Sequence, residues 1–550
     1  MRLDPVDAVV IGAGAGGGVV AKELAGAGFR VALLERGRLQ KYSETGHDEL
    51  RSQRTTVLGN AFGPDDERHL RLVRLGDDNE FRETLPSEGS YGNVAACVGG
   101  GTFSFGAMAW RFLEKDFRMR STYGAPEGST LEDWPIAYAD LEPFYSKAEW
   151  EIGVSGKAGA NPFEPPRSKP YPMPALPYSK EGSVLLTAAQ RLQWHPFPIP
   201  MLINSVAYRG RPGCIRCPHC VGFACESHSK SSTAVTVIPE AVKTGLCDLR
   251  TECVAKEILT DGRGNASAVA YFQGSELREQ PCRFVVVSAS ATESPRLLLN
   301  SKSRLHARGL GNNSDWVGRN LQGHAYSGAY GLFPQDLFDG LGPAACIAVC
   351  DFNHGNPGLR GGARMANEFI RLPYLFARSV RPPGAPRWGL AHKQFQRDRY
   401  KRCAGIKGPV QEMPVFTNRV EVEENRKDHW GIPVAKITGK RHPHDIEIGR
   451  FIAGRAAQWL EEAGAEQVWT TVAGKGSTGG QHQAGTCRMG NDPKTSVVDR
   501  TCRVHQTDNV YVVDGSVHVT NGGFNPALTI LATAYWASHH IVSQQRKAQA

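Results

Sequence analysis

The first forty residues alternate between apolar runs and clusters of glycine. Residues 7–12 read Asp-Ala-Val-Val-Ile-Gly, an apolar run that predicts a short buried β-strand. Residues 19–27 are rich in alanine, valine and leucine and predict a helix, and residues 30–34 predict a second strand that ends at Glu35. A strand, a glycine-rich turn, a helix and a second strand in this order are typical of the start of a nucleotide-binding α/β domain.

The turn after the first strand has the pattern G-x-G-x-x-G at Gly12, Gly14 and Gly17. Gly12 allows a tight turn, Gly14 lets the backbone approach a pyrophosphate, and Gly17 lets the helix pack closely on the strand. The helix N-terminus presents N–H groups and a positive dipole end to phosphates. Glu35 lies 23 residues after Gly12, where a carboxylate can bind ribose hydroxyls. These features predict a dinucleotide site and allow either NAD or FAD.

A second set of elements lies near the C-terminal end. Residues 510–513 form an apolar run that predicts a strand ending at Asp514, where a carboxylate can meet the edge of a bound cofactor. Gly515 begins a turn. Pro526 precedes the apolar run 527–542 and suits the first turn of a helix, whose N-terminus can then stabilise negative charge on the cofactor.

The length of 550 residues predicts two or three domains, interleaved along the chain. The net charge is +9, from 64 basic and 55 acidic residues, but no basic run reaches five residues. This spread indicates a solvated surface and no nucleic-acid interface. No apolar run approaches the length of a transmembrane helix, and the first predicted strand begins too early to leave room for an export signal.

Several segments, in order along the chain, resemble motifs of the glucose-methanol-choline (GMC) oxidoreductase family. They are the glycine-rich segment 98–106, residues 133–145, residues 284–299, the Gly-Arg-Asn-Leu-Gln-Gly-His turn within 317–324, and the C-terminal block 482–530. The resemblance is thin between 331 and 475. It implies FAD rather than NAD. It also implies an α/β fold in which a Rossmann-like FAD-binding domain is interleaved with an α+β substrate domain built on a mixed sheet.

The resemblance and the local patterns together give a set of expected FAD-binding residues. They are Gly12, Gly14, Gly17, Glu35, Gly100, Gly101, Thr102, Ser104, Asp514, Gly515, Asn525 and Pro526. Ser104 matches the position where some family members carry a histidine bonded to FAD. The resemblance therefore implies that FAD is bound non-covalently here.

His482 matches the catalytic histidine of the family, and Asn525 matches the second member of the catalytic pair, which is His or Asn in different members. Oxidation of an alcohol requires the loss of a hydroxyl proton and of a hydride. A neutral histidine can accept the proton near neutral pH, and an amide can donate a hydrogen bond to the alcohol oxygen. An ordinary structural histidine and a helix cap at Asn525 are the alternatives.

Cys214, Cys217, Cys220 and Cys225 form the pattern C-x2-C-x2-C-x4-C. Four thiolates this close can surround one metal centre, and compact spacing of this kind favours an iron–sulfur cluster over zinc. Disulfides or free thiols are the further alternatives. The loop is similar to one in bacterial GMC sugar dehydrogenases. It implies one-electron transfer from flavin to a protein acceptor such as a cytochrome, whereas an enzyme without a cluster would favour oxygen as the acceptor.

We expect the FAD-binding domain to comprise residues 1–160, 205–330 and 476–550, and the substrate domain to comprise residues 331–475. The proline-rich stretch 161–204 predicts a long surface loop or lid. Candidate sugar contacts in the substrate domain are Arg364, Asn367, His392, Gln394 and Gln396.

The family and the cysteine loop imply a sugar, glycoside or sugar acid as substrate. The leading prediction is an FAD-dependent sugar dehydrogenase with a protein acceptor. The rivals are an oxygen-using sugar oxidase and a flavoprotein whose FAD is structural or serves a lyase. The missing export signal favours the cytoplasm. Related dehydrogenases imply the alternative of export to the periplasm with a small partner subunit.

Overall fold

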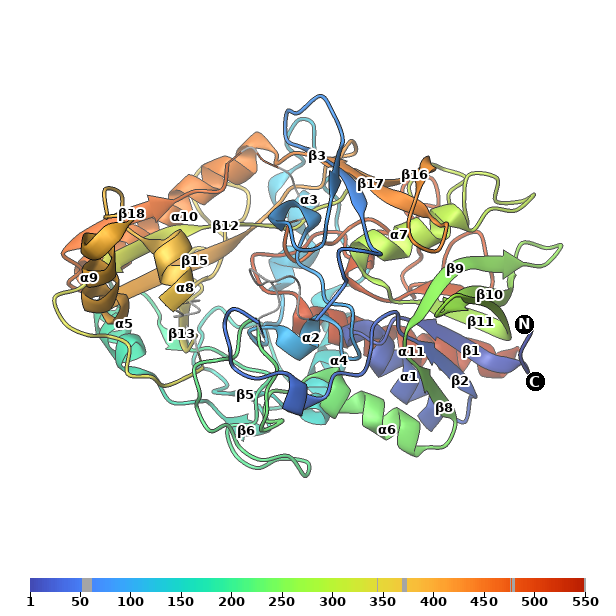
Figure 1. Ribbon diagram of the computed structural model, residues 1–550, viewed down its shortest axis with the longest axis horizontal. Coiled ribbons are helices and arrows are strands. Elements are labelled where there is room, and N and C mark those ends of the chain that lie inside the picture. Colours follow the sequence, from blue (N-terminus) through green and yellow to red (C-terminus); the bar gives the residue numbers. More distant parts are fainter. Residues whose placement is uncertain (52–61, 344, 368–372, 475, 477–479, 549–550) are drawn as a thin grey trace.

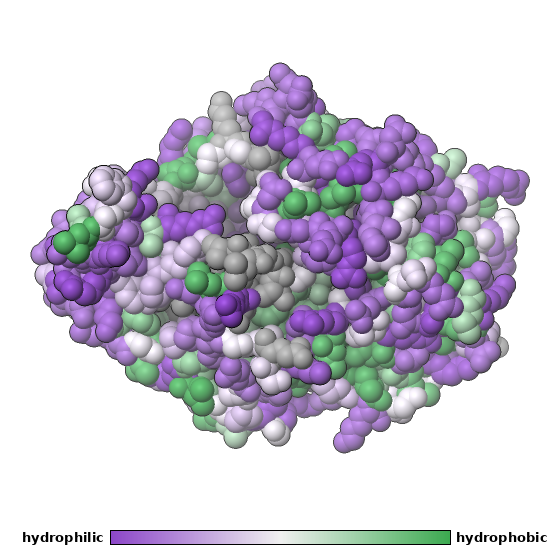
Figure 2. All heavy atoms as spheres, viewed as in Figure 1, coloured by the Kyte–Doolittle hydropathy of each residue, from purple (hydrophilic) through white to green (hydrophobic). Residues whose placement is uncertain are grey.

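The computed structural model describes residues 1–51, 62–343, 345–367, 373–474, 476 and 480–548. Two large sheets lie towards opposite ends of the long axis, and the N- and C-terminal ends of the chain lie together at one of these ends (Figure 1). Hydrophilic residues cover most of the face in Figure 2, and hydrophobic residues occur there in scattered patches. Within the described residues, no helix combines the length and apolar character needed to cross a membrane.

The seven-stranded sheet contains the predicted nucleotide-binding start. Its order is β8 (Cys247–Arg250), β2 (Val31–Leu34), β1 (Val6–Ile11), β11 (Glu276–Val287), β10 (Ala266–Gln273) and β9 (Cys253–Thr260), and β19 (Val510–Val512) also pairs with β11. The first half of β11 pairs antiparallel with β10, and its second half lies parallel between β1 and β19. β1, β2 and β19 are apolar and largely buried, as expected for parallel strands covered on both faces.

Helix α1 (Ala15–Gly26) packs against α11 (Ala527–Lys547) and α6 (Val237–Lys243), and α11 also packs against α4 (Tyr138–Ala148). The predicted strands and helices are confirmed, although α1 begins four residues earlier than predicted. Its first turn reads Ala-Gly-Gly-Gly and carries no apolar side-chain pattern that could reveal it.

The six-stranded sheet lies at the other end of the molecule (Figure 1). Its order is β18 (Gln467–Thr471), β12 (His324–Leu332), β15 (Cys403–Gln411), β14 (Met365–Ala366), β13 (Ile347–Val349) and β7 (Phe197–Pro198). Helix α10 (Pro443–Glu462) packs across β12 and β15 and buries Ile448, Ile452 and Trp459. The strand pairings among the described residues of this sheet are all antiparallel, where a mixed sheet was expected.

A mixed order occurs instead in a four-stranded sheet, β16 (Arg419–Lys427), β17 (Pro433–Gly439), β3 (Arg71–Leu75) and β4 (Arg82–Thr84). β17 lies parallel to β3, which comes from the first hundred residues. Strand β7 likewise joins the six-stranded sheet from outside residues 331–475. The α/β class with interleaved parts is therefore confirmed, while the exact domain boundaries stay predictions.

The proline-rich stretch 161–204 is not loop throughout. It contains helix α5 (Lys180–Arg191), which packs on α10 and buries Leu185 and Ala189. The Ser179 hydroxyl caps α5 by accepting a hydrogen bond from the Gly182 amide at 3.2 Å. The chain on either side of α5 is mostly irregular, so the prediction of a loop fails at α5 itself.

The remaining α-helices and strands of the described residues lie outside these three sheets, and β5 and β6 pair with each other. They are α2 (Gly101–Ser104), α3 (Met119–Tyr123), α7 (Ser290–Asn300), α8 (Pro373–Leu375), α9 (Gly389–Arg399), β5 (Ser155–Gly156) and β6 (Met173–Pro174).

Candidate active site

A cavity of about 630 Å³ extends from the turn after β1 to the face of β12. Its walls come from both large sheets, from the glycine-rich segment at 100–108, and from the starts of α7 and α11. The volume is within the range of cofactor and substrate sites.

The three N-terminal glycines have different surroundings. A Cβ on Gly12, whose φ is +100°, would lie 2.3 Å from the Ser288 carbonyl oxygen, and a Cβ on Gly17 would lie 1.9 Å from the Gly12 oxygen. A Cβ on Gly14 would meet no protein atom within 4 Å, and Gly14 lines the cavity. Gly12 and Gly17 therefore permit close packing, and Gly14 leaves space for a ligand to approach the backbone.

Glu35 lines the same end of the cavity, directly after β2. Its two carboxylate oxygens accept hydrogen bonds from the backbone amides of Ala13 and Gly37, each at 2.9 Å. Burial raises the pKa of Glu35, although the two amides favour the charged form. This fixed carboxylate beside the glycine turn fits the ribose of a dinucleotide.

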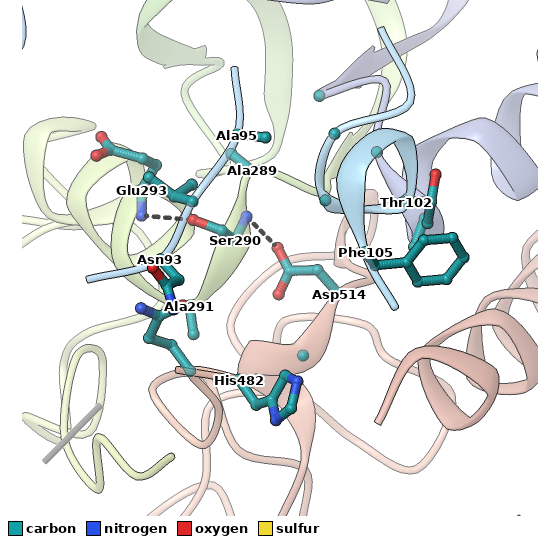
Figure 3. A pocket seen from close by; sticks show the side chains of 18 of the residues that line it. Asn93, Ala95, Thr102, Phe105, Ala289, Ser290, Ala291, Glu293, His482 and Asp514 are labelled. Carbon is teal, nitrogen blue, oxygen red and sulfur yellow. Dashed lines mark hydrogen bonds between the residues drawn. The ribbon is translucent and has the colours of Figure 1, made fainter. Parts of the chain in front are cut away.

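The glycine-rich segment forms another wall. Gly100, Gly101 and Thr102 line the cavity, and the single turn of α2 brings Phe105 to the same side (Figure 3). Ser104 is fully buried, does not line the cavity, and its backbone oxygen accepts a hydrogen bond from Gly222 at 2.7 Å. Ser104 is thus buried behind the residues that line the cavity, and its contact with FAD stays a prediction.

Asp514, at the end of β19, joins two turns at the cavity wall. Its carboxylate accepts hydrogen bonds from the amides of Ser290 (3.0 Å) and Ser516 (2.8 Å) and from the Ser294 hydroxyl (2.5 Å). Figure 3 shows the hydrogen bond from the Ser290 amide to Asp514. The backbone φ of Ser290 is +88°. A non-glycine residue in this conformation is strained, and Asp514 helps to hold it. Gly515 lines the cavity beside Asp514.

Asn525 and Pro526 line the cavity at the start of α11. The Asn525 side-chain oxygen accepts hydrogen bonds from the Trp110 indole nitrogen at 3.1 Å and from the Arg364 guanidinium, and its Nδ2 donates to the Tyr326 hydroxyl at 2.9 Å. Tryptophan and arginine can only donate. The amide orientation is therefore defined by its partners.

His482 lines the same end of the cavity (Figure 3). The centroids of the His482 and Tyr326 rings are 6.0 Å apart. The His482 backbone has a φ of +58°, and its carbonyl accepts a hydrogen bond from the Asn521 side chain at 2.7 Å. The structure thus brings the predicted pair, His482 and Asn525, together around Tyr326.

Sequence reasoning missed Tyr326, Trp110 and His324. His324 ends a motif that was recognised, and the two-residue period of a strand puts Tyr326 on the same face. Of the candidate sugar contacts, Arg364 is buried behind Asn525 rather than exposed to the cavity.

The other candidate sugar contacts do not line the cavity either. The Asn367 oxygen accepts hydrogen bonds from the amides of Cys346 and Ile347 at 2.9 and 3.0 Å, so Asn367 has a structural position. His392, Gln394 and Gln396 lie on α9. The expectation that these four side chains bind a sugar is therefore corrected.

The four cysteines at 214–225 do not form the expected metal centre. Throughout the described part of the chain, no group of three or more His, Cys, Asp or Glu side chains is arranged to hold a metal ion. Burial raises the pKa of Cys214, whereas hydrogen bonds from Ser227, Ser229 and the Lys230 amide outweigh burial and lower the pKa of Cys225. The iron–sulfur prediction is therefore not supported by the arrangement of these side chains.

The chain matches two family models of the GMC oxidoreductases, one over residues 176–326 and one over residues 414–534. The chain belongs to this family, whose members are FAD-dependent. A 6'''-hydroxyparomomycin C oxidase of Streptomyces lividus is 32% identical over 98% of this chain and 91% of its own length. A gluconate 2-dehydrogenase flavoprotein of Pantoea cypripedii is 28% identical over 99% of this chain and 95% of its own length.

The crystal structure of a pyridoxine 4-oxidase from Mesorbium loti has the same fold. Its TM-score is 0.63 at 16% identity, over 97% of this chain and 98% of the other. These comparisons confirm the family resemblance, the oxidoreductase class and the α/β fold. The glycine turn, Glu35 and the volume of the cavity fit the FAD on which the family depends.

Proposed function

We propose that this protein oxidises a hydroxyl group of a sugar, glycoside or sugar acid to a carbonyl, with FAD held non-covalently in the 630 Å³ cavity. The observation that carries the proposal is that His482 and Asn525 line the same cavity as Gly14 and Glu35.

In the proposed reaction the alcohol loses a proton and a hydride from one H–C–O–H group. Bound FAD supplies the hydride acceptor. His482 takes up the hydroxyl proton as general base. Asn525 holds the alcohol oxygen by donating from Nδ2, which has a second hydrogen besides the one given to the Tyr326 hydroxyl. The positive end of the α11 dipole lies at Pro526 and Ala527, where it would stabilise negative charge at the cavity wall.

The names of the two relatives support a polyhydroxylated substrate, since one refers to gluconate and the other to hydroxyparomomycin. We infer that the electron acceptor is a protein or dye, with a cytochrome and a small partner subunit as the proposed assembly. Molecular oxygen is the second candidate, because the relative at 32% identity is named an oxidase. Without support for a cluster, the cysteine loop no longer argues for the protein acceptor, which now rests on the relative named a dehydrogenase.

Anaerobic spectra of the FAD-loaded protein test the proposal. The panel comprises gluconate, glucose, methyl glucoside and paromomycin, with benzyl alcohol as the control without a sugar. Bleaching of the flavin absorbance by a sugar and not by the control is the expected result. Readmission of air then separates the acceptors, because an oxidase recovers its absorbance and releases peroxide. A panel in which no sugar bleaches the flavin would overturn the proposal.

His482→Gln tests the proposed base. Flavin reduction should slow by roughly 10²–10⁴-fold, because general-base catalysis contributes about that much. His539→Gln is the matched control, since His539 is exposed on α11 and does not line the cavity. Equal reduction rates in the two variants would sink the assignment of His482.

A further inference from the structure

The buried imidazole of His324 lies between His482 and the backbone of residues 521–522. Its Nε2 is 2.7 Å from the Gly522 oxygen and 3.2 Å from the Asn521 oxygen, and its Nδ1 is 2.9 Å from Nδ1 of His482. Carbonyl oxygens can only accept hydrogen bonds. Nε2 of His324 therefore carries a proton and donates it to this backbone.

Burial lowers the pKa of His324 to about 4, so the ring is neutral at neutral pH. The charged groups that act on it have opposite effects, since Glu412 raises this pKa and Arg364 lowers it. His518, the other nearby imidazole, is also kept neutral, because burial lowers its pKa to about 4. A neutral ring with its proton on Nε2 has a lone pair on Nδ1. The proton in the 2.9 Å contact must then come from Nδ1 of His482.

We propose that His324 is a positioning residue that fixes the tautomer of His482. By accepting a hydrogen bond from Nδ1–H of His482, it leaves Nε2 of His482 unprotonated and able to take a proton from the substrate. The inference rests on the proposed role of His482 as the base. Once Nε2 of His482 is protonated, the Nδ1–H bond to His324 becomes charge-assisted and stabilises the imidazolium.

The backbone around the two rings makes them one unit. Asn521 and Gly522 accept the Nε2 proton of His324, and the Asn521 side chain donates to the His482 carbonyl at 2.7 Å. The strand position of His324 at the start of β12 is set by its pairing with Gln411. A rotation of the His482 ring would therefore break its hydrogen bond to Nδ1 of His324, and the His324 ring is itself held in place by the backbone oxygens of Asn521 and Gly522.

The first test needs no substitution in the His324 side chain. Two-bond ¹H–¹⁵N correlation spectra of the FAD-loaded enzyme, labelled with ¹⁵N-histidine, report which ring nitrogen carries the proton. The His482 signals are assigned by their loss in His482→Gln. We expect His482 protonated on Nδ1 and His324 protonated on Nε2. His482 protonated on Nε2 in the resting enzyme would overturn the inference.

The second test uses two variants of His324 and the panel sugar that reduces the flavin fastest. His324→Leu removes the acceptor, whereas His324→Asn retains an oxygen near the position of Nδ1. We expect His324→Leu to slow flavin reduction by roughly 10- to 100-fold. The acid limb of its pH profile should move to lower pH, because the lost bond had favoured protonated His482. His324→Asn should recover part of the rate and move the limb back.

The outcomes separate this inference from the proposed function. The positioning role is overturned if the acid limb of the pH profile of His324→Leu coincides with that of the unmodified enzyme, whatever the rate of flavin reduction in the variant. Flavin reduction that is unaffected in His482→Gln overturns the proposed function instead. The NMR result does not depend on any substrate, so it tests the tautomer even if no sugar in the panel is oxidised.

Discussion

Arg364 donates a hydrogen bond to the side-chain oxygen of Asn525, across 161 residues of sequence. The guanidinium is completely buried and also lies 5.2 Å from the centre of the Trp110 ring. Arg364 and Trp110 thus hold the same amide oxygen from outside the cavity. Arg364, just before β14, therefore helps to hold Oδ1 of Asn525 away from the cavity and leaves Nδ2 to face it.

Arg364→Met should slow flavin reduction by about 10-fold, because loss of a hydrogen bond to a charged group is worth roughly 1.5 kcal/mol or more. Trp110 still holds the amide oxygen, so the loss should be partial. FAD content should stay normal, since Arg364 does not line the cavity. Stopped-flow reduction and the flavin-to-protein absorbance ratio measure the two quantities.

Arg455→Met on α10 controls for the loss of a partly buried arginine that packs on aromatic rings. Arg364→Lys should recover little, because lysine lacks the planar group that reaches the amide oxygen. A variant Arg364→Met with normal turnover would show that Trp110 alone orients Asn525.

Gly14→Ala should weaken FAD binding without destabilising the protein. The added methyl group meets no protein atom within 4 Å, and the φ of Gly14 is −86°, outside the left-handed region that disfavours alanine. The methyl group would occupy space in the cavity that a pyrophosphate needs. We expect FAD affinity to fall by at least about 10-fold, as measured by titration of the apoprotein.

Gly26→Ala is the matched control in the same helix. Gly26 is exposed near the end of α1, and a Cβ there also meets nothing within 4 Å. This variant should bind FAD normally and gain up to about 1 kcal/mol of stability from helix propensity. Equal FAD affinity in the two variants would contradict the assignment of Gly14 to the cofactor site.

The sequence predicts the nucleotide-binding start well because its signals are local. The turn at Gly12, the carboxylate of Glu35 and the strand ending at Asp514 each depend on a few neighbouring residues. The phase of a single helical turn is harder to predict. In α2 two positions separate Thr102, which lines the cavity, from Ser104, which does not.

Long-range contacts could not be predicted from local patterns. His324 and His482 are 158 residues apart, and their contact depends on how β12 packs against the C-terminal block. The four cysteines are a local pattern that the structure does not support as a metal site. Their spacing satisfies a metal pattern, but hydrogen bonds to Cys225 and the burial of Cys220 give the thiols separate environments.

The free energy of unfolding should fall as the pH is lowered from about 6.5 towards 4. His324 and His518 have pKa values of about 4 in the folded protein and 6.5 as the ordinary value, so the unfolded chain binds more protons in this range. Between about pH 7 and pH 5 each buried histidine should cost roughly 2 kcal/mol. Urea denaturation at the two pH values measures the difference.

His518→Asn removes one of these titrations and retains a side-chain amide that can donate to the Asn521 oxygen, the partner of His518 at 3.2 Å. The stability difference between the two pH values should shrink by roughly 2 kcal/mol in this variant. His539→Asn, at an exposed position on α11, should leave it unchanged. The same pH dependence in all three proteins would show that His518 is not buried as a neutral ring.

Alkylation should reveal unequal thiols in the segment 214–225. The pKa of Cys225 is lowered by its hydrogen bonds, at 3.4 Å from the Ser227 hydroxyl and 3.4 Å from the Lys230 amide, although burial alone would raise it. Burial raises the pKa of Cys214 and raises that of Cys220 to about 12. Because the thiolate is the nucleophile, iodoacetamide near neutral pH should modify Cys225 first, as peptide mass spectrometry can follow.

Ser227→Ala and Ser229→Ala together remove two of the groups that stabilise the Cys225 thiolate, so they should slow its modification towards the rate of Cys214. The metal content of the same sample supplies the control. The opposite outcome is a protein that contains iron and whose four cysteines become reactive together only after chelation. This outcome would support the iron–sulfur prediction, because ligation to one cluster protects all four thiolates at once. Selective reaction of Cys225 in metal-free protein that still binds FAD would instead establish that the four cysteines are separate thiols and that FAD binding does not require a metal in this segment.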